Sequence, residues 1–180
     1  GVIIAQHFGA DRHSEVKSAI YNSALITIVF GVVISIVSTL LAEPLLIFLE
    51  TPKNLLPTAV SYMRISCGGT ILVALYNWIT SVMRSLGDSK TPLIFLFIAS
   101  VLNVGLDLLF VIVFDWKAEG AAIATIIAQG VAAAGSLIFG FVKNPHIKLS
   151  RDDMRFDRAM TKRCIFTGIP IAVQNCVISV

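Results

Sequence analysis

Residues 20–42 read IYNSALITIVFGVVISIVSTLLA, an uninterrupted run without a single charged side chain. A transmembrane helix needs about 20 mostly apolar residues to cross a hydrocarbon layer of about 30 Å, because each residue adds about 1.5 Å. The run therefore predicts a membrane-spanning helix over residues 20–42. Glu43 and Pro44 follow directly, so we expect the span to end there and residues 45–54, which are too few to cross, to lie in the membrane interface.

Further apolar runs and the overall composition point the same way. Hydrophobic residues make up 56% of the chain and charged residues 14%, with a mean hydropathy of +0.85, whereas soluble domains carry about 25% charged residues. We therefore expect an all-α polytopic membrane protein, an antiparallel bundle of transmembrane helices. The chain lacks an initiator Met and both ends fall within apolar runs, so we expect a fragment of a longer protein. The other spans are expected at 59–83, 93–114 and 120–142, with partial spans at 1–9 and 164–180.

Basic residues alternate between the connections. Eleven of the 14 Lys and Arg residues lie in three of them, near residues 10–19, 84–92 and 143–163. Basic residues in short loops collect on the cytoplasmic side of a membrane. We therefore expect a multi-pass protein of the plasma membrane with these three connections in the cytoplasm. The net charge of +3 then needs no nucleic-acid partner.

The connection RSLGDSKTP at 84–92 carries signals for a turn and a helix start. Gly87 followed by Asp88 favours a turn. Thr91 is a good N-cap, and Pro92 suits the first position of a helix. We expect the following span to begin at Pro92 with Thr91 as its cap.

Asp107 is the only acidic residue inside an expected span, within VLNVGLDLLFVIVF at 101–114. It lies about 5 Å outward of the centre of that span, given the rise of a helix. A carboxylate at such a depth costs about 2.5–3.5 kcal/mol on insertion scales, and side chains of this kind usually face a protein interior or an aqueous cavity. Asp107 is therefore a candidate group for taking up and releasing a cation.

Three polar residues accompany this carboxylate. Asn103 lies four residues earlier and hence on the same helical face. Thr125 lies in the next span, at a depth that differs from that of Asp107 by about 3 Å, and Gln129 follows one turn further. If the two helices are neighbours, these residues share a pocket. Simpler roles stay open: Asn103 can bond to another helix, and Thr125 can bond to its own backbone.

Other polar residues within the spans are candidates for lining a cavity. Tyr76 and Asn77 lie deep in the span at 59–83, and Gln174 and Asn175 follow a proline in the last partial span. We find no phosphate-binding loop, no Ser–His arrangement and no histidine–carboxylate cluster, and the three Cys residues lack metal-type spacing. We therefore expect no enzymatic activity, no bound metal apart from a coupling ion, and no cofactor.

Five stretches of the chain form an ordered set of motifs: AQHFGADRHSEVKSA (5–19), YMRISCGG (62–69), MRSLGDSKTPL (83–93), LNVGLDLLFV (102–111) and EGAAIATIIAQ (119–129). In this order and spacing they resemble the multidrug and toxic compound extrusion (MATE) transporters, membrane antiporters with twelve helices in two lobes. The resemblance implies that residues 1–142 form an N-terminal lobe from the end of helix 2 to helix 6. Residues 143–163 would be a cytoplasmic linker, and residues 164–180 would begin the C-terminal lobe with helix 7.

The same resemblance assigns the polar residues a role. In such transporters a polar cluster in the N-terminal lobe binds the coupling cation, H⁺ or Na⁺, and its Asn, Asp and Thr fall on Asn103, Asp107 and Thr125. The partner Asp on the first helix lies outside this chain. An acidic residue found on helix 7 of some sodium-coupled members has no counterpart before Val180, which favours H⁺, while Na⁺ at Asp107 stays open.

The resemblance thus implies a cation-coupled antiporter that exports organic, cationic and amphiphilic compounds, with the lipid bilayer as its other partner. We expect the full-length protein to be monomeric. One alternative is a lipid-linked oligosaccharide flippase of the same superfamily, which predicts a strongly basic central cavity although the spans hold only Arg64. Another is a membrane scaffold without transport, which predicts a permanent ion pair between Asp107 and a cation on another helix.

Overall fold

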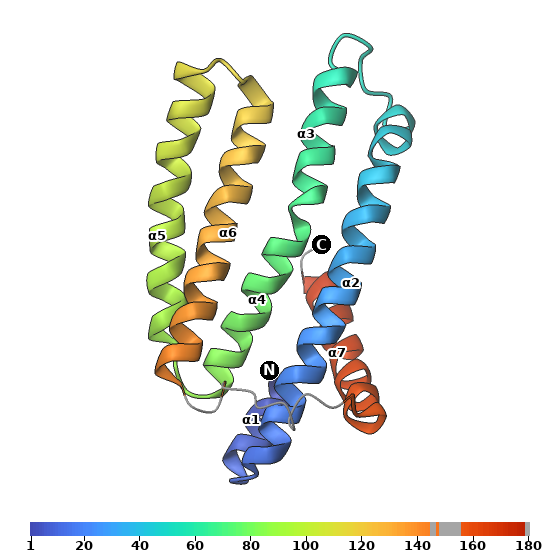
Figure 1. Ribbon diagram of the computed structural model, residues 1–180. Helices are drawn as coiled ribbons and strands as arrows, with labels where there is room; N and C mark the ends of the chain where they lie inside the picture. Colours follow the sequence, from blue (N-terminus) through green and yellow to red (C-terminus); the bar gives the residue numbers. More distant parts are fainter. Residues whose placement is uncertain (145–146, 148–155, 179–180) are drawn as a thin grey trace.

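The computed structural model describes residues 1–144, 147 and 156–178, and these form helices joined by short connections (Figure 1). Four of the described helical segments are long and apolar enough to cross a membrane: His13–Phe48, Leu56–Ser85, Lys90–Val113 and Lys117–Lys143. The predicted all-α polytopic architecture is confirmed. The elements are α1 (Val2–Gly9), α2 (His13–Phe48), α3 (Leu56–Gly68), α4 (Thr70–Ser85), α5 (Lys90–Asp107), the π-helix η1 (Leu108–Val113), α6 (Lys117–Lys143) and α7 (Arg158–Ile178).

The outer surfaces of these helices are apolar. Leu40 of α2, Phe97 of α5 and Ile112 of η1 are 70%, 71% and 69% exposed. Isolated exposed apolar side chains are ordinary on soluble proteins, but long contiguous apolar faces are not. Such faces suit contact with lipid.

Helix α2 is longer than we predicted. Our expectation that it ends at Glu43–Pro44 is wrong, because the helix continues through Pro44 to Phe48. Proline removes one backbone hydrogen bond and crowds the preceding turn, yet here it lies only four residues from the helix end. Glu43 also accepts a 2.8 Å hydrogen bond from Arg64 of α3, which ties this end of α2 to its neighbour.

The span predicted at 59–83 is divided in two. Helix α3 ends at Gly68 and α4 begins at Thr70, which leaves backbone carbonyls without their helical donors. The hydroxyl of Ser35 on α2 donates to two of them, Cys67 O at 2.8 Å and Gly68 O at 3.2 Å. A side chain at Gly69 would collide with Ile126 of α6. The lack of a side chain at Gly69 therefore allows α6 to pass close to the α3–α4 junction.

The start of α5 is capped differently from our prediction. Thr91 is not the cap: it lies inside the helix, which begins at Lys90, and Asp88 caps it. The Asp88 carboxylate accepts the Thr91 backbone N–H at 3.0 Å and its hydroxyl at 2.7 Å, and Lys143 lies 3.5 Å away. Burial alone would raise the pKa of Asp88, but the hydrogen bonds from Thr91 and the charge of Lys143 outweigh it and hold that pKa below its ordinary value.

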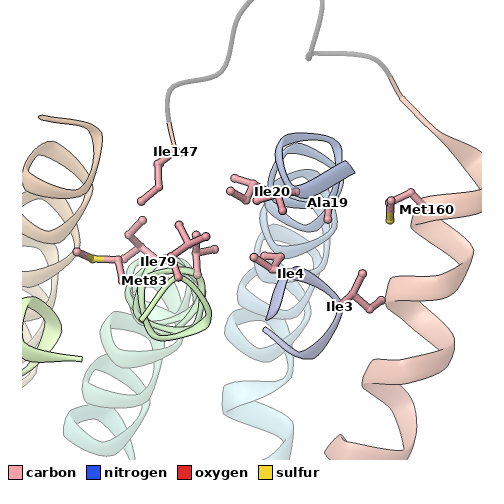
Figure 2. Packing of buried hydrophobic residues seen from close by; sticks show 11 residues of the cluster. Ile3, Ile4, Ala19, Ile20, Ile79, Met83, Ile147 and Met160 are labelled. Atoms are coloured by element: carbon pink, nitrogen blue, oxygen red, sulfur yellow. The ribbon is translucent and has the colours of Figure 1, made fainter. Parts of the chain in front are cut away.

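The largest apolar cluster lies at one end of the bundle, which we call the basic end: the α1–α2 connection at 10–12, the turn at 86–89 and the end of α6 at 143–144. Figure 2 shows this cluster, in which Ile147 lies beside Ile79 and Met83 of α4 and is fully buried. Met160 of α7 lies beside Ala19 of α2. The buried members are Ile3, Ile4, Val16, Ala19, Ile20, Ile79, Val82, Met83, Leu86, Ile147 and Met160.

Candidate cation site and adjoining cavity

Asp107 lies where the α-helical geometry of α5 ends and η1 begins. Within η1 the backbone hydrogen bonds span five residues instead of four, as in the 3.1 Å bond from Phe114 N–H to Leu109 O. Short π-helical turns are often found at functional sites because they widen the helix and redirect side chains. Asp107, the predicted candidate, therefore lies at a local change in helix geometry that the apolar sequence did not predict.

The structure brings Asn103 and Thr125 together. The Asn103 side-chain amide donates to the Thr125 hydroxyl at 3.3 Å, and that hydroxyl donates to Ala121 O at 3.0 Å. Helices α5 and α6 are thus neighbours at this depth, as the pocket requires. Both of the simpler roles are present as well, since Asn103 bonds to another helix and Thr125 to its own backbone.

Asp107 is half-buried, and its Oδ1 atom is buried without a hydrogen-bond partner among the residues that the structure describes. The Oε1 atom of Gln129, one turn beyond Thr125 on α6, is in the same condition. A buried oxygen without a partner costs about 1–3 kcal/mol. Because an ionised carboxylate offers only acceptors, a cation bound at Asp107 would supply the missing partner, whereas a proton would remove the charge and turn one oxygen into a hydrogen-bond donor.

A permanent ion pair is not seen at this carboxylate. Arg64, the only basic residue in the predicted spans, is engaged with Glu43 at 2.8 Å. Within the described ranges, no Lys or Arg side chain forms an ion pair with Asp107. This arrangement does not favour the scaffold alternative, which required such a pair.

A cavity of about 680 Å³ adjoins α4 and α6, and its lining includes three predicted residues, Tyr76, Asn77 and Gln129. The Tyr76 hydroxyl is fixed by a 3.1 Å hydrogen bond to Pro92 O. Thr80, which the sequence analysis did not single out, also lines this cavity, and its buried hydroxyl has no partner within the described chain. The sequence feature that could have identified Thr80 is its position, one turn after Tyr76 on the same face of the helix.

Gln174 on α7 is not brought to this cavity. Its side chain is exposed and does not line the cavity at α4 and α6, the cavity between α2, α4 and α7, or the one near Tyr62. The side chain of Asn175 lies outside the described residues. A role for these two residues in lining a cavity stays a prediction.

Comparison with known proteins identifies the family. The family model named MatE matches residues 1–109. The probable multidrug resistance protein YpnP of Bacillus subtilis is 35% identical over 98% of this chain, and the chain covers 39% of YpnP. The probable multidrug resistance protein NorM of Thermotoga maritima is 26% identical over 99% of the chain, again covering 39% of the relative. The chain thus spans about two fifths of the length of these relatives.

Solved structures share the fold. A crystal structure described as MATE in the bent conformation superposes with a TM-score of 0.91 at 22% identity, over 98% of this chain and 40% of that one. An inward-facing multidrug resistance MATE family transporter of the MOP superfamily gives a TM-score of 0.87 at 22% identity, over 94% of this chain and 39% of the other. The arrangement of α1 to α7 is therefore that of part of such a transporter.

Proposed function

Because this chain belongs to the MatE family, we propose that the protein containing it is a cation-coupled antiporter exporting organic, cationic and amphiphilic compounds. Support comes from the relatives named as multidrug resistance proteins and from the polar residues at the α5–α6 interface. H⁺ and Na⁺ are the candidate coupling ions. The observation that carries the proposal is the buried Oδ1 atom of Asp107, which has no hydrogen-bond partner among the described residues and belongs to a residue one helical turn from Asn103, the partner of Thr125.

The proposed mechanism is alternating access between two lobes. Residues 1–142 form part of the first lobe, residues 143–163 connect the lobes on the cytoplasmic side, and α7 begins the second lobe. Binding of a cation at Asp107 and binding of the exported compound favour different arrangements of the lobes. Each ligand shifts the equilibrium only by its difference in affinity for the two arrangements. Asp107 changes charge when it binds H⁺ and gains ligand bonds when it binds Na⁺, which supplies that difference.

The orientation belongs to the same proposal. The α1–α2 connection, the α4–α5 turn and the end of α6 all lie at the basic end, and we place this end in the cytoplasm of a cell whose plasma membrane holds the protein. Asp107 then lies in the outer half of the bilayer. The full-length protein acts as a monomer.

The flippase alternative gains no support. It requires a strongly basic central cavity, but Arg84 is the only charged side chain among the described residues that line the two cavities of about 680 Å³. A single arginine does not offer the dense positive charge that a lipid-linked polyphosphate would need.

The test is transport by the full-length protein in proteoliposomes under separate H⁺ and Na⁺ gradients, with a fluorescent organic cation as substrate. Asp107→Asn is expected to reduce gradient-driven export to the level of empty vesicles, because the amide neither takes up a proton nor carries a charge for Na⁺. Asp115→Asn is the matched control: Asp115 is an exposed carboxylate beyond η1, and its loss should leave export unchanged. Export by Asp107→Asn at the unmodified rate under both gradients would contradict the proposal.

A further inference from the structure

Asn22 of α2 is a fully buried polar residue outside the cation site. Its side-chain oxygen accepts two hydrogen bonds, one from the Asp157 backbone N–H and one from the Thr161 hydroxyl, each at 3.1 Å. Its amide nitrogen donates to Ser18 O at 2.8 Å. These bonds join residues 135 and 139 positions apart, so Asn22 connects α2 directly to the start of α7.

The segment that Asn22 holds is the cap of α7. The Asp157 carboxylate accepts the backbone N–H groups of Ala159 at 2.8 Å and Met160 at 3.2 Å, which satisfies the free donors of the first turn. Met160, in the same turn, is buried in the apolar cluster next to Ala19 (Figure 2). The first turn of α7 is therefore attached to α2 by both polar and apolar contacts.

This attachment adjoins a cavity of about 680 Å³ between α1, α2, α4 and α7. On α2 the cavity is lined by Ala19 and Ile26, which lie about one turn to either side of Asn22, and on α7 it is lined by Cys164, one turn after Thr161. The bonded residue of α7 is thus closer to the basic end than the lining residue, whereas Asn22 lies alongside the cavity. The contact between Asn22 and α7 therefore closes the seam between these two helices along one side of the cavity.

A contact of this kind has two stable states. When α7 is docked, the buried carboxamide of Asn22 is hydrogen-bonded; when α7 moves away, water can reach the same atoms. An intermediate separation leaves buried polar atoms without partners, at about 1–3 kcal/mol for each group. The docked and separated arrangements are therefore favoured over the geometries between them.

We propose that Asn22, Asp157 and Thr161 form a latch that closes the seam between α2 and α7 beside this cavity and must open for the cavity to reach the cytoplasm. The latch rests on the proposed alternating access, since α7 begins the second lobe in that scheme. Asn22 is a positioning residue here, because it acts by holding α7 and not by touching the exported compound.

Cys164 offers a native reporter of the latch. It is half-buried, packs against the apolar cluster and lines the cavity one turn beyond Met160. The experiment uses the full-length protein with every other cysteine replaced by serine, including Cys67 and Cys176. A membrane-impermeant maleimide is added to inside-out vesicles and, separately, to intact cells, and the rate of Cys164 labelling is measured from each side.

Asn22→Ala is expected to increase labelling from the cytoplasmic side about tenfold to thirtyfold, because two hydrogen bonds worth about 1 kcal/mol each are lost. Thr161→Val removes one of these bonds with little change in shape and should increase the rate about fivefold. Ser23→Ala is the matched control, since its hydroxyl bonds to Trp78 and Ile20 O and not to α7. It should leave the rate unchanged.

Unchanged labelling in both Asn22→Ala and Thr161→Val would overturn the latch, and so would an equal increase in Ser23→Ala. If Asn22→Ala is labelled faster from both sides, its fold is disturbed, and Thr161→Val decides alone: a one-sided increase supports the latch and no increase refutes it. The measurement uses no substrate and no ion gradient. A failure of cation coupling at Asp107 would therefore leave the labelling result standing, and the two proposals can fail separately.

Discussion

Asn22 and Asp107 are both polar residues within long apolar helices, but they differ in burial and in how completely their side chains are hydrogen-bonded. Asn22 is fully buried, and its carboxamide is hydrogen-bonded to α7 and to its own helix. Asp107 is half-buried and keeps a buried oxygen without a partner among the described residues. A polar group whose bonds are complete holds a structure together, whereas one whose bonds are incomplete is available for a ligand.

The surroundings of the two residues reinforce the contrast. Asn22 is next to the eleven-residue apolar cluster at the basic end. Asp107 lies at a junction of α-helix and π-helix, and the member of a second, smaller cluster on the same helix, Ala99, lies about two turns earlier. We infer that the basic end supplies stability while the region around Asp107 is left adaptable. The predictions below are arranged to test this division.

The largest expected effect comes from the apolar cluster itself. Met83 is fully buried there, so Met83→Ala should lower the free energy of unfolding by about 2–5 kcal/mol through lost contacts and a residual cavity. Thermal unfolding of the full-length protein in detergent measures the loss. Val101→Ala, at a side chain that is 59% exposed, should change stability by less than about 0.5 kcal/mol. Equal effects would mean that the cluster is not the main source of stability.

The second prediction compares the two polar residues directly. Asn22→Ala should cost about 1–3 kcal/mol, because the backbone N–H of Asp157 and the Thr161 hydroxyl lose a buried acceptor. Asp107→Asn should leave stability unchanged or slightly raised, because it removes a charge that is costly to insert. Both are measured as shifts in the unfolding temperature of the detergent-solubilised protein. A larger loss for Asp107→Asn than for Asn22→Ala would reverse the assignment of structural and ligand-binding roles.

The sequence predicted the spans better than their internal geometry. Length and hydropathy located all four long helices, since lipid contact selects residues by apolarity alone. They did not reveal the extension of α2 through Pro44 or the break at Gly69. Such details depend on partners far along the chain: Ser35 supplies the hydroxyl that makes the break acceptable, and Ile126 occupies the space that a side chain at Gly69 would need.

The candidate site was also predictable only in part, because its contacts depend on partners far along the chain. Helical rise placed Asp107 and Thr125 at depths about 3 Å apart, with Asn103 on the same helical face as Asp107. The structure joins Asn103 to Thr125. Thr80 and Asn22 were passed over, because a single threonine or asparagine near a helix end is common and its importance depends on how neighbouring helices are rotated. The only advance signal for Asn22 was that it stands as the one carboxamide in the charge-free run at 20–42.

The third prediction concerns pH and the turn at the basic end. Since the pKa of Asp88 is held below its ordinary value near 3.8, its ionised form stabilises the fold at pH values above 3.8. This contribution is lost as the pH falls from 3.8 through the lower pKa of the folded state. Asp88→Ala should therefore cost about 0.5–2 kcal/mol at neutral pH through the lost helix cap, and this difference from the unmodified protein should shrink in acid.

Unfolding temperatures of both proteins between pH 7 and about pH 3 provide the measurement. Asp115→Asn is a suitable control, because Asp115 is an exposed carboxylate in the connection between η1 and α6. A difference between Asp88→Ala and the unmodified protein that grows in acid would show that the carboxylate destabilises the turn.

The smallest effect is expected at the bond between Asn103 and Thr125. At 3.3 Å this hydrogen bond is long, and interhelical bonds of this kind contribute on average about 0.6 kcal/mol in membrane proteins. Asn103→Ala should thus shift the unfolding temperature only slightly, while export under the coupling gradient falls, because the amide borders the candidate cation site. Ser100→Ala lies one turn earlier on α5 and removes only a bond to its own helix, at Leu96 O; it should change neither quantity. A loss of stability for Asn103→Ala as large as that for Asn22→Ala would make Asn103 a structural residue, and the contrast between the two regions would then reduce to Asp107 alone.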